Sequence, residues 1–139
     1  MMEPLTVPGT LDSLSLIGQY VTEAAQAAGL EKKAAYRLRL AVDEIATNVA
    51  TYGYAEAGIT GTIVVNATID DETLTITLED TAAPFDPLQH DTDNLGLDLP
   101  LDERRIGGLG VFLALNGVDQ FYYQHVNDRN RNVFVMKRT

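Results

Sequence analysis

Apolar residues recur at helical spacing along two segments in the first half of the chain. In residues 11–28 the apolar stripe consists of Leu14, Ile17, Val21, Ala24 and Ala28. Over residues 31–54 a second stripe is formed by Leu38, Val42, Ile45 and Val49. Steps of three and four residues place such side chains on one helical face, and Gly29 stands where helices commonly stop. Two amphipathic helices are therefore predicted, each with one face packed on a core.

Alternating apolar and polar residues predict strands in the remainder of the chain. A short extended start runs through Leu5 and Val7, and strands follow over residues 61–69, 74–80, 120–125 and 132–137. Acidic residues 70–72 join the first long pair as a hairpin, and a polar turn is expected at residues 127–130. This order predicts an α+β fold in which helices cover one face of a mixed, mostly antiparallel sheet. At 139 residues the chain is expected to form one domain, residues 1–139.

Charge and composition narrow the classes of function. The formal net charge is −10 at pH 7, which argues against direct binding of nucleic acid because that role normally needs a basic surface. No apolar run reaches the length of a membrane helix, and the first residues lack the features of a signal peptide. The absence of cysteine excludes disulfides and thiolate metal sites. A cytoplasmic protein without membrane contact is expected.

Three glycines, Gly107, Gly108 and Gly110, lead directly into an apolar, helix-prone segment that ends near residue 116. Glycine permits close approach of the backbone to a ligand, and the amides at a helix start favour phosphate. This segment is therefore a candidate anion site. Taken alone, a glycine-rich loop that merely turns into a helix is the better explanation.

Glu44 and Asn48 lie one turn apart on the flank of the apolar face of the second helix. Partial burial of a carboxylate and a carboxamide is costly without a partner, and hydrated magnesium bridging to phosphate is one suitable partner. A solvated helix face is the simpler interpretation of this pair on its own. Tyr52 and Tyr54, which follow, are predicted to be packing residues.

Asp80 stands at the end of the strand predicted over residues 74–80. A carboxylate in that position can accept a hydrogen bond from an exocyclic amine in an adjoining pocket. Aspartate also commonly ends strands and caps turns, so the residue alone does not identify a site.

Together and in this order, the three motifs resemble those of the GHKL superfamily of ATP-binding domains. Within it the chain is similar to the bacterial anti-sigma-factor serine/threonine kinases of partner-switching systems. The resemblance covers nearly the whole chain and is carried by three boxes. They comprise Glu44, Asn48, Tyr52, Gly53 and Tyr54, then Asp80 with Pro84, Phe85, Asp86 and Pro87, and finally Gly107, Gly108 and Gly110.

The resemblance implies a two-layer Bergerat (histidine kinase-like ATPase) fold that binds ATP or ADP with Mg²⁺. It assigns Glu44 as the general base for attack by a serine hydroxyl, Asn48 as the magnesium ligand and Asp80 as the residue that recognises the adenine amino group. Phosphates would be held by the amides of residues 108–110. The complete candidate nucleotide site is Asn48, Asp80, Ala82, Phe85, Arg104, Arg105, Gly107, Gly108, Leu109 and Gly110.

One departure from the superfamily pattern concerns the loop after Asp80. Where relatives usually carry Asp-x-Gly-x-Gly, this chain has alanine and proline, Ala82 and Pro84, in place of both glycines. Ala82 adds a methyl group where backbone normally approaches the purine, and Pro84 removes an amide donor. Further on, residues 88–105 are predicted to form a lid that ends at Arg104 and Arg105, for which phosphate contact and pairing with nearby acidic residues are equally good explanations.

Two classes of function follow from the resemblance. The first is a serine/threonine kinase that phosphorylates an anti-anti-sigma partner of the STAS type. Binding of a sigma factor and assembly as a homodimer are left open by the resemblance. The second is a nucleotide-dependent protein-binding switch with little or no phosphoryl transfer. Glu44 favours the first, and the altered loop after Asp80 favours the second. A stand-alone catalytic domain of a histidine kinase is a weaker third, because the sequence contains no dimerising pair of helices with a phosphoacceptor histidine.

Overall fold

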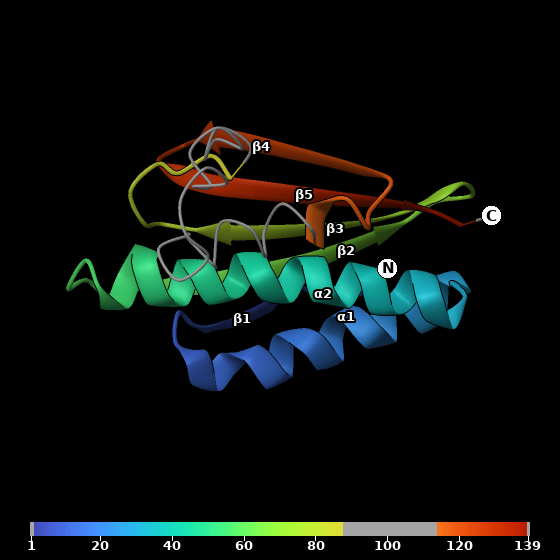
Figure 1. Ribbon diagram of the computed structural model, residues 1–139, viewed down its shortest axis with the longest axis horizontal. Helices are drawn as coiled ribbons and strands as arrows, with labels where there is room; N and C mark the ends of the chain where they lie inside the picture. Colours follow the sequence, from blue (N-terminus) through green and yellow to red (C-terminus); the bar gives the residue numbers. More distant parts are fainter. Residues whose placement is uncertain (1, 88–113, 139) are drawn as a thin grey trace, which may run out of the picture.

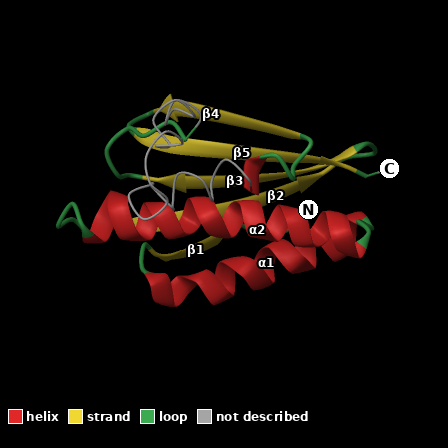
Figure 2. Cartoon of the chain, in the orientation of Figure 1, coloured by secondary structure: helices red, strands yellow, loops and turns green. Residues whose placement is uncertain are grey.

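A computed structural model describes residues 2–87 and 114–138, which form two long helices packed on one face of a five-stranded sheet (Figures 1 and 2). The chain begins with β1 (Leu5–Pro8), the short 3₁₀ turn η1 (Leu11–Ser13) and α1 (Leu14–Ala28). The second helix, α2 (Lys32–Asn48), continues into the π-helical segment η2 (Val49–Ala55). Two hairpins complete the sheet, β2 (Thr62–Ile69) with β3 (Thr73–Asp80) and β4 (Gln120–Val126) with β5 (Arg129–Lys137). The predicted α+β architecture is confirmed.

The strands follow the order β1-β2-β3-β5-β4 across the sheet. Every pairing among the described strands is antiparallel, so the parallel component expected of a mixed sheet is not found within residues 2–87 and 114–138. The β3–β5 pairing joins segments far apart in sequence, from Thr73 opposite Lys137 to Asp80 opposite Asn130. That register determines which side chains surround the end of β3.

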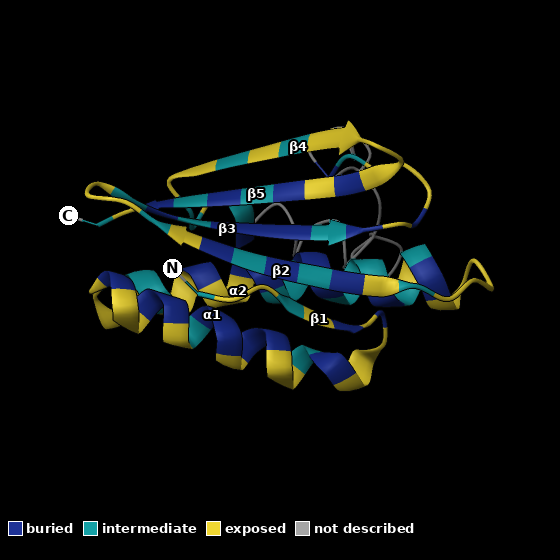
Figure 3. Cartoon of the chain, turned by 180° about the vertical axis from the view of Figure 1, so that it is seen from behind, coloured by how far each residue is buried: buried dark blue, intermediate teal, exposed yellow. Residues whose placement is uncertain are grey.

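The core lies between the helices and the facing side of the sheet. Figure 3 shows buried positions alternating along the strands and following one side of each helix. Every second side chain of β5 is buried, and these residues are Asn130, Asn132, Phe134 and Met136. Two polar residues therefore continue the row of core side chains on this strand. The Phe134 ring is fully buried and meets Phe121 of β4 edge to face, with ring centroids 5.1 Å apart.

Two predicted chain reversals have the expected backbone. Gly29 ends α1 with φ 74°, a left-handed conformation that glycine adopts without steric cost. Asp70 closes the β2–β3 hairpin through its side chain, whose Oδ1 accepts from the amides of Glu72 and Thr73 at 2.8 and 2.7 Å.

The second hairpin turn is shorter than the sequence suggested. Within residues 127–130, positive φ angles occur at Asn127 and Asp128 alone, at 55° and 61°, as a two-residue hairpin connection requires. Arg129 and Asn130, predicted to lie in the turn, belong to β5 instead. Their polar side chains are typical of a loop. The two-residue turn, however, fixes the register between β4 and β5 and places Asn130 among the buried residues.

None of the helices in the described part of the chain is long and apolar enough to cross a membrane.

Replacing Phe134 by alanine should test the core directly. Removal of a fully buried ring leaves a cavity, and we expect the free energy of unfolding to fall by about 3–5 kcal/mol in urea denaturation. Tyr122→Ala is the control, because that ring is 47% exposed on neighbouring β4 and should cost about 0.5 kcal/mol. Equal losses in the two variants would contradict the assignment of the core.

Candidate nucleotide site

Asp80 is a buried carboxylate whose two oxygens have different surroundings. The residue is 2% exposed at the end of β3. Its Oδ1 accepts hydrogen bonds from the Ala82 amide at 3.0 Å and from Asn130 Nδ2 at 2.8 Å. Its Oδ2 is buried and has no hydrogen-bond partner among the described residues. A buried acceptor without a donor is costly, so this oxygen marks a position that an N–H group of a ligand would satisfy.

Burial raises the pKa of the Asp80 carboxyl above its ordinary value, although the hydrogen bonds from Asn130 and Ala82 and the nearby His125 act in the opposite direction. Desolvation is the largest of these effects. A neutral donor such as an exocyclic amine can bind such a carboxyl without bringing a charge into the pocket.

The loop after β3, residues 81–85, is held by side chains from both neighbouring layers. From the helical layer, the Tyr54 hydroxyl accepts from the Thr81 amide at 2.8 Å and donates to the Thr62 carbonyl at 2.9 Å. From the sheet, Asn130 Nδ2 donates to the carbonyls of Ala82 and Ala83 at 3.1 and 3.0 Å. The loop is therefore fixed although it contains no glycine.

The Ala82 methyl group lies toward the protein interior. Ala82 is 6% exposed, and its Cβ would be only 3.0 Å from a Cβ placed on Gly53 of η2. Gly53 thus provides the space that Ala82 fills. Phe85 lies farther along the loop, where its ring is 47% exposed and its amide donates to Tyr123 and Asn130, each at 3.2 Å.

Tyr54 connects the end of the long helix to this loop. Its ring is 2% exposed and packs where Gly9 and Gly61 approach it, because a Cβ on either glycine would stand within 2.2–2.7 Å of ring atoms. The prediction that Tyr54 packs is confirmed, and its hydroxyl has the additional role described above. The same prediction for Tyr52 is wrong, since that side chain is 59% exposed.

Glu44 and Asn48 lie on α2, both at intermediate burial, and Asn48 is the last residue before the π-helical segment. Neither side chain has a hydrogen bond or ion pair to another residue within 2–87 or 114–138. Burial raises the pKa of Glu44, and the neighbouring Asp43 raises it further. A carboxylate with a raised pKa is a better proton acceptor than an ordinary surface glutamate.

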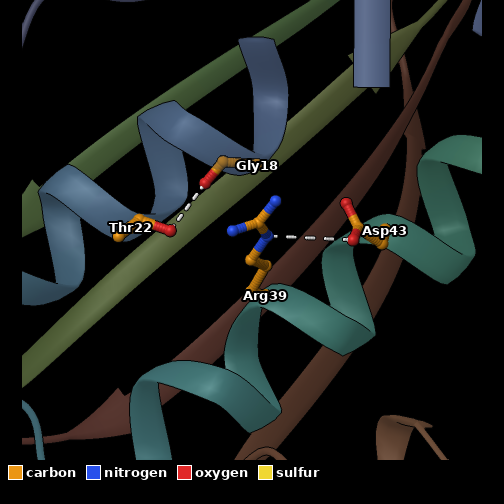
Figure 4. Close-up of polar contacts among 4 residues, drawn as sticks. All are labelled: Gly18, Thr22, Arg39 and Asp43. Carbon is orange, nitrogen blue, oxygen red and sulfur yellow. Dashed lines mark hydrogen bonds and ion pairs between the residues drawn. The ribbon is translucent and has the colours of Figure 1, made fainter. Parts of the chain in front are cut away.

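Asp43 belongs to the contact between the helices. Its carboxylate faces the Arg39 guanidinium at 4.0 Å, and Figure 4 shows Arg39 extending from α2 toward α1. A Cβ on Gly18 would come within 2.9 Å of that guanidinium, so the glycine permits Arg39 to lie against α1. Burial raises the pKa of Asp43 as well, while Arg39 acts in the opposite direction. Of the two adjacent acids, Asp43 is the one with a basic partner among the described residues.

The described residues offer little for a resident metal. No group of three or more histidine, cysteine, aspartate or glutamate side chains could hold an ion within residues 2–87 and 114–138. The carboxamide oxygen of Asn48 suits a hard cation such as Mg²⁺, which keeps several waters and shares phosphate oxygens. These residues fit an ion that arrives with a nucleotide better than one held by the protein alone.

Six predicted site residues lie outside the described residues: Arg104, Arg105, Gly107, Gly108, Leu109 and Gly110. The same holds for the predicted lid and for the start of the glycine-opened helix. The structure therefore brings Asp80, Ala82 and Phe85 together at the end of β3 and places Glu44 and Asn48 on α2.

Sequence reasoning missed Asn130 and Tyr123 and assigned Tyr54 only to packing. One signal was available for Asn130. Along β5, Asn130 and Asn132 have the same parity as the core residues Phe134 and Met136, and polar residues at core parity indicate a buried polar site.

Comparison with known proteins identifies the family of the chain. A family model described as the histidine kinase-like ATPase domain matches residues 7–137, so the chain belongs to that family. A search of curated proteins gave no significant match.

Among solved structures, the chain is similar to the histidine kinase domain of the blue-light activated histidine kinase from Erythrobacter litoralis EL346. The TM-score is 0.55 at 16% identity, over 88% of this chain and 63% of that chain. This chain thus spans less than two thirds of that domain, and the likeness concerns the fold.

The Tyr54 hydroxyl can be tested with a matched pair of variants. Tyr54→Phe keeps the ring but leaves the Thr81 amide without its acceptor, so we expect the free energy of unfolding to fall by about 1–3 kcal/mol. Tyr52→Phe removes an exposed hydroxyl and should change it by less than about 0.5 kcal/mol. Chemical denaturation measures both, and similar values would remove the proposed link between η2 and the loop.

The buried carboxyl also predicts a pH dependence. Because the folded-state pKa of Asp80 is raised above 3.8, its contribution to stability is full below that ordinary value and is lost as the pH rises through the folded-state pKa. Asp80→Asn cannot ionise, so the variant should gain stability relative to the unmodified protein over that interval. Urea denaturation at a series of pH values measures the difference, and a difference independent of pH would contradict the raised pKa.

Proposed function

We propose that this protein binds ATP through Asp80 and transfers the γ-phosphoryl group to a serine or threonine of an anti-anti-sigma partner of the STAS type. The observation that carries the nucleotide part is the unpaired, buried Oδ2 of Asp80 within a histidine kinase-like ATPase domain. Adenine presents an exocyclic amine to such an acceptor, whereas guanine presents a carbonyl at the corresponding edge.

Glu44 would act as the general base. It accepts the proton of the attacking hydroxyl while the hydroxyl oxygen forms a bond to the γ-phosphorus and ADP departs with the bridging oxygen. The raised pKa of Glu44 and its lack of a described partner support this role. Asn48, one turn away on α2, would hold Mg²⁺, which neutralises phosphate charge when bound.

The kind of partner is inferred from the resemblance to partner-switching kinases. That resemblance rests on the boxes around Glu44, Asp80 and Gly107. The chain's histidine kinase-like ATPase family is consistent with it but leaves the acceptor residue open.

A second candidate function is a nucleotide-dependent binding switch without efficient transfer. It is favoured by one observation, the loop of residues 81–85, in which no glycine is present and side chains of Tyr54 and Asn130 fix the backbone. A loop held in one conformation suits recognition of the base, which is the part of the site that a switch needs.

Transfer of labelled phosphate from ATP to a STAS-type protein with Mg²⁺ separates the two functions. For a kinase, Glu44→Gln should retain nucleotide affinity but lose on the order of a hundredfold or more in transfer rate. Asp43→Asn is the matched control, since that neighbouring acid pairs with Arg39 and should leave the rate within about threefold. Unimpaired transfer by Glu44→Gln would reassign the base, and no transfer by the unmodified protein despite ATP binding would favour the switch.

A further inference from the structure

We infer that Asn130 is a positioning residue that orients the Asp80 carboxylate and the loop of residues 81–85, so that the free oxygen of Asp80 faces the purine. This inference rests on the proposed binding of an adenine nucleotide. The observation behind it is a single buried carboxamide that hydrogen-bonds to Asp80 and to three residues of that loop, Ala82, Ala83 and Phe85.

The contacts of Asn130 divide cleanly between its two polar atoms. Nδ2 lies within donor distance of three acceptors, Asp80 Oδ1 at 2.8 Å and the carbonyls of Ala82 and Ala83 at 3.1 and 3.0 Å, so its two hydrogens are shared among them. Oδ1 accepts from the Phe85 amide at 3.2 Å and from the Tyr123 hydroxyl. All donors face Oδ1 and all acceptors face Nδ2, which defines the orientation of the amide.

Only a side chain that donates and accepts at this distance can make these contacts. Aspartate has the same shape but cannot donate to Asp80 or to the two carbonyls, and at neutral pH it would place a second carboxylate beside the first. Alanine provides neither function. Since Asn130 is 3% exposed, water cannot readily replace the lost hydrogen bonds.

The consequence for Asp80 follows from its own two oxygens. Asn130 and the Ala82 amide occupy Oδ1, and both hydrogen bonds hold the carboxylate in one rotamer. Oδ2 then has no hydrogen-bond partner in the described part of the chain. Without Asn130 the carboxylate could rotate, and its alignment toward an amine would be lost while the phosphate end of the nucleotide would be unaffected.

Asn130 is therefore expected to govern discrimination by the base. The measure is the ratio of dissociation constants for ADP and for purine riboside diphosphate, which lacks the exocyclic amine. In the unmodified protein a hydrogen bond from the amine to a carboxylate should give a ratio of about 10- to 100-fold. In Asn130→Asp and Asn130→Ala the ratio should fall to about threefold or less, mainly because ADP binds more weakly.

Two further variants keep the test decisive. Asn66→Asp makes the same chemical change on β2, where Asn66 lies between the buried residues Val65 and Ala67 and is itself only partly buried. This variant should keep the full ratio of dissociation constants. Tyr123→Phe removes a hydrogen bond to Asn130 from a partly exposed position, so it tests the same contact if the Asn130 variants fail to fold. We expect Tyr123→Phe to lower the ratio by about twofold to fivefold.

Calorimetric titration with both nucleotides, accompanied by circular dichroism, distinguishes the outcomes. A wild-type ratio retained by the folded Asn130 variants, or by Tyr123→Phe where those do not fold, would overturn the role of Asn130 and leave the proposed function intact. No binding, or a ratio near one, in the unmodified protein would overturn the proposed recognition of adenine and the inference with it. A general fall in affinity for both nucleotides at constant ratio would show a merely structural role and would also overturn the inference.

Discussion

The buried carboxylate of Asp80 is the constraint on which the site depends. Removing an ionisable group from water is unfavourable, and within residues 2–87 and 114–138 hydrogen-bond donors reach only one of its two oxygens. The pKa of Asp80 is raised for the same reason, because burial disfavours the charged carboxylate. Such a group lowers the stability of the free protein, and a ligand that donates to Oδ2 recovers part of that loss as binding free energy.

The long helix relates this carboxylate to the rest of the candidate site. α2 carries Glu44 and Asn48. Its π-helical continuation carries Tyr54, whose hydroxyl bonds to the Thr81 amide and the Thr62 carbonyl. One continuous helical segment thus positions the proposed base and magnesium ligand and also anchors the loop beside Asp80. Widened helical turns are frequent at functional sites, and here the π-helical segment carries the Tyr54 hydroxyl that makes these two hydrogen bonds.

The elements of the fold could be predicted from the sequence because their signals are local. The stripes in α1 and α2 and the alternation around Leu74 have the periods of the structures that they form. The contacts of Asn130 could not be predicted in the same way, because its polar neighbours resemble a loop and its role depends on the register between β3 and β5. Glu44, Asn48 and Asp80 were predicted from a combination of motifs. Their proposed roles depend on a nucleotide, which the periodicity of the chain does not specify.

The alanines in the loop after Asp80 change the steric argument about nucleotide binding. A methyl group at position 82 would obstruct a purine if it faced the ligand, but it is buried beside Gly53, which has no side chain to oppose it. The space that a loop glycine would create is thus created by a helix glycine. Alanine also has fewer conformations to lose on folding than glycine, and Asn130 adds hydrogen bonds that fix the loop. Ala82 therefore gives no steric reason against binding of the base, and the hydrogen bonds from Asn130 point to a rigid loop.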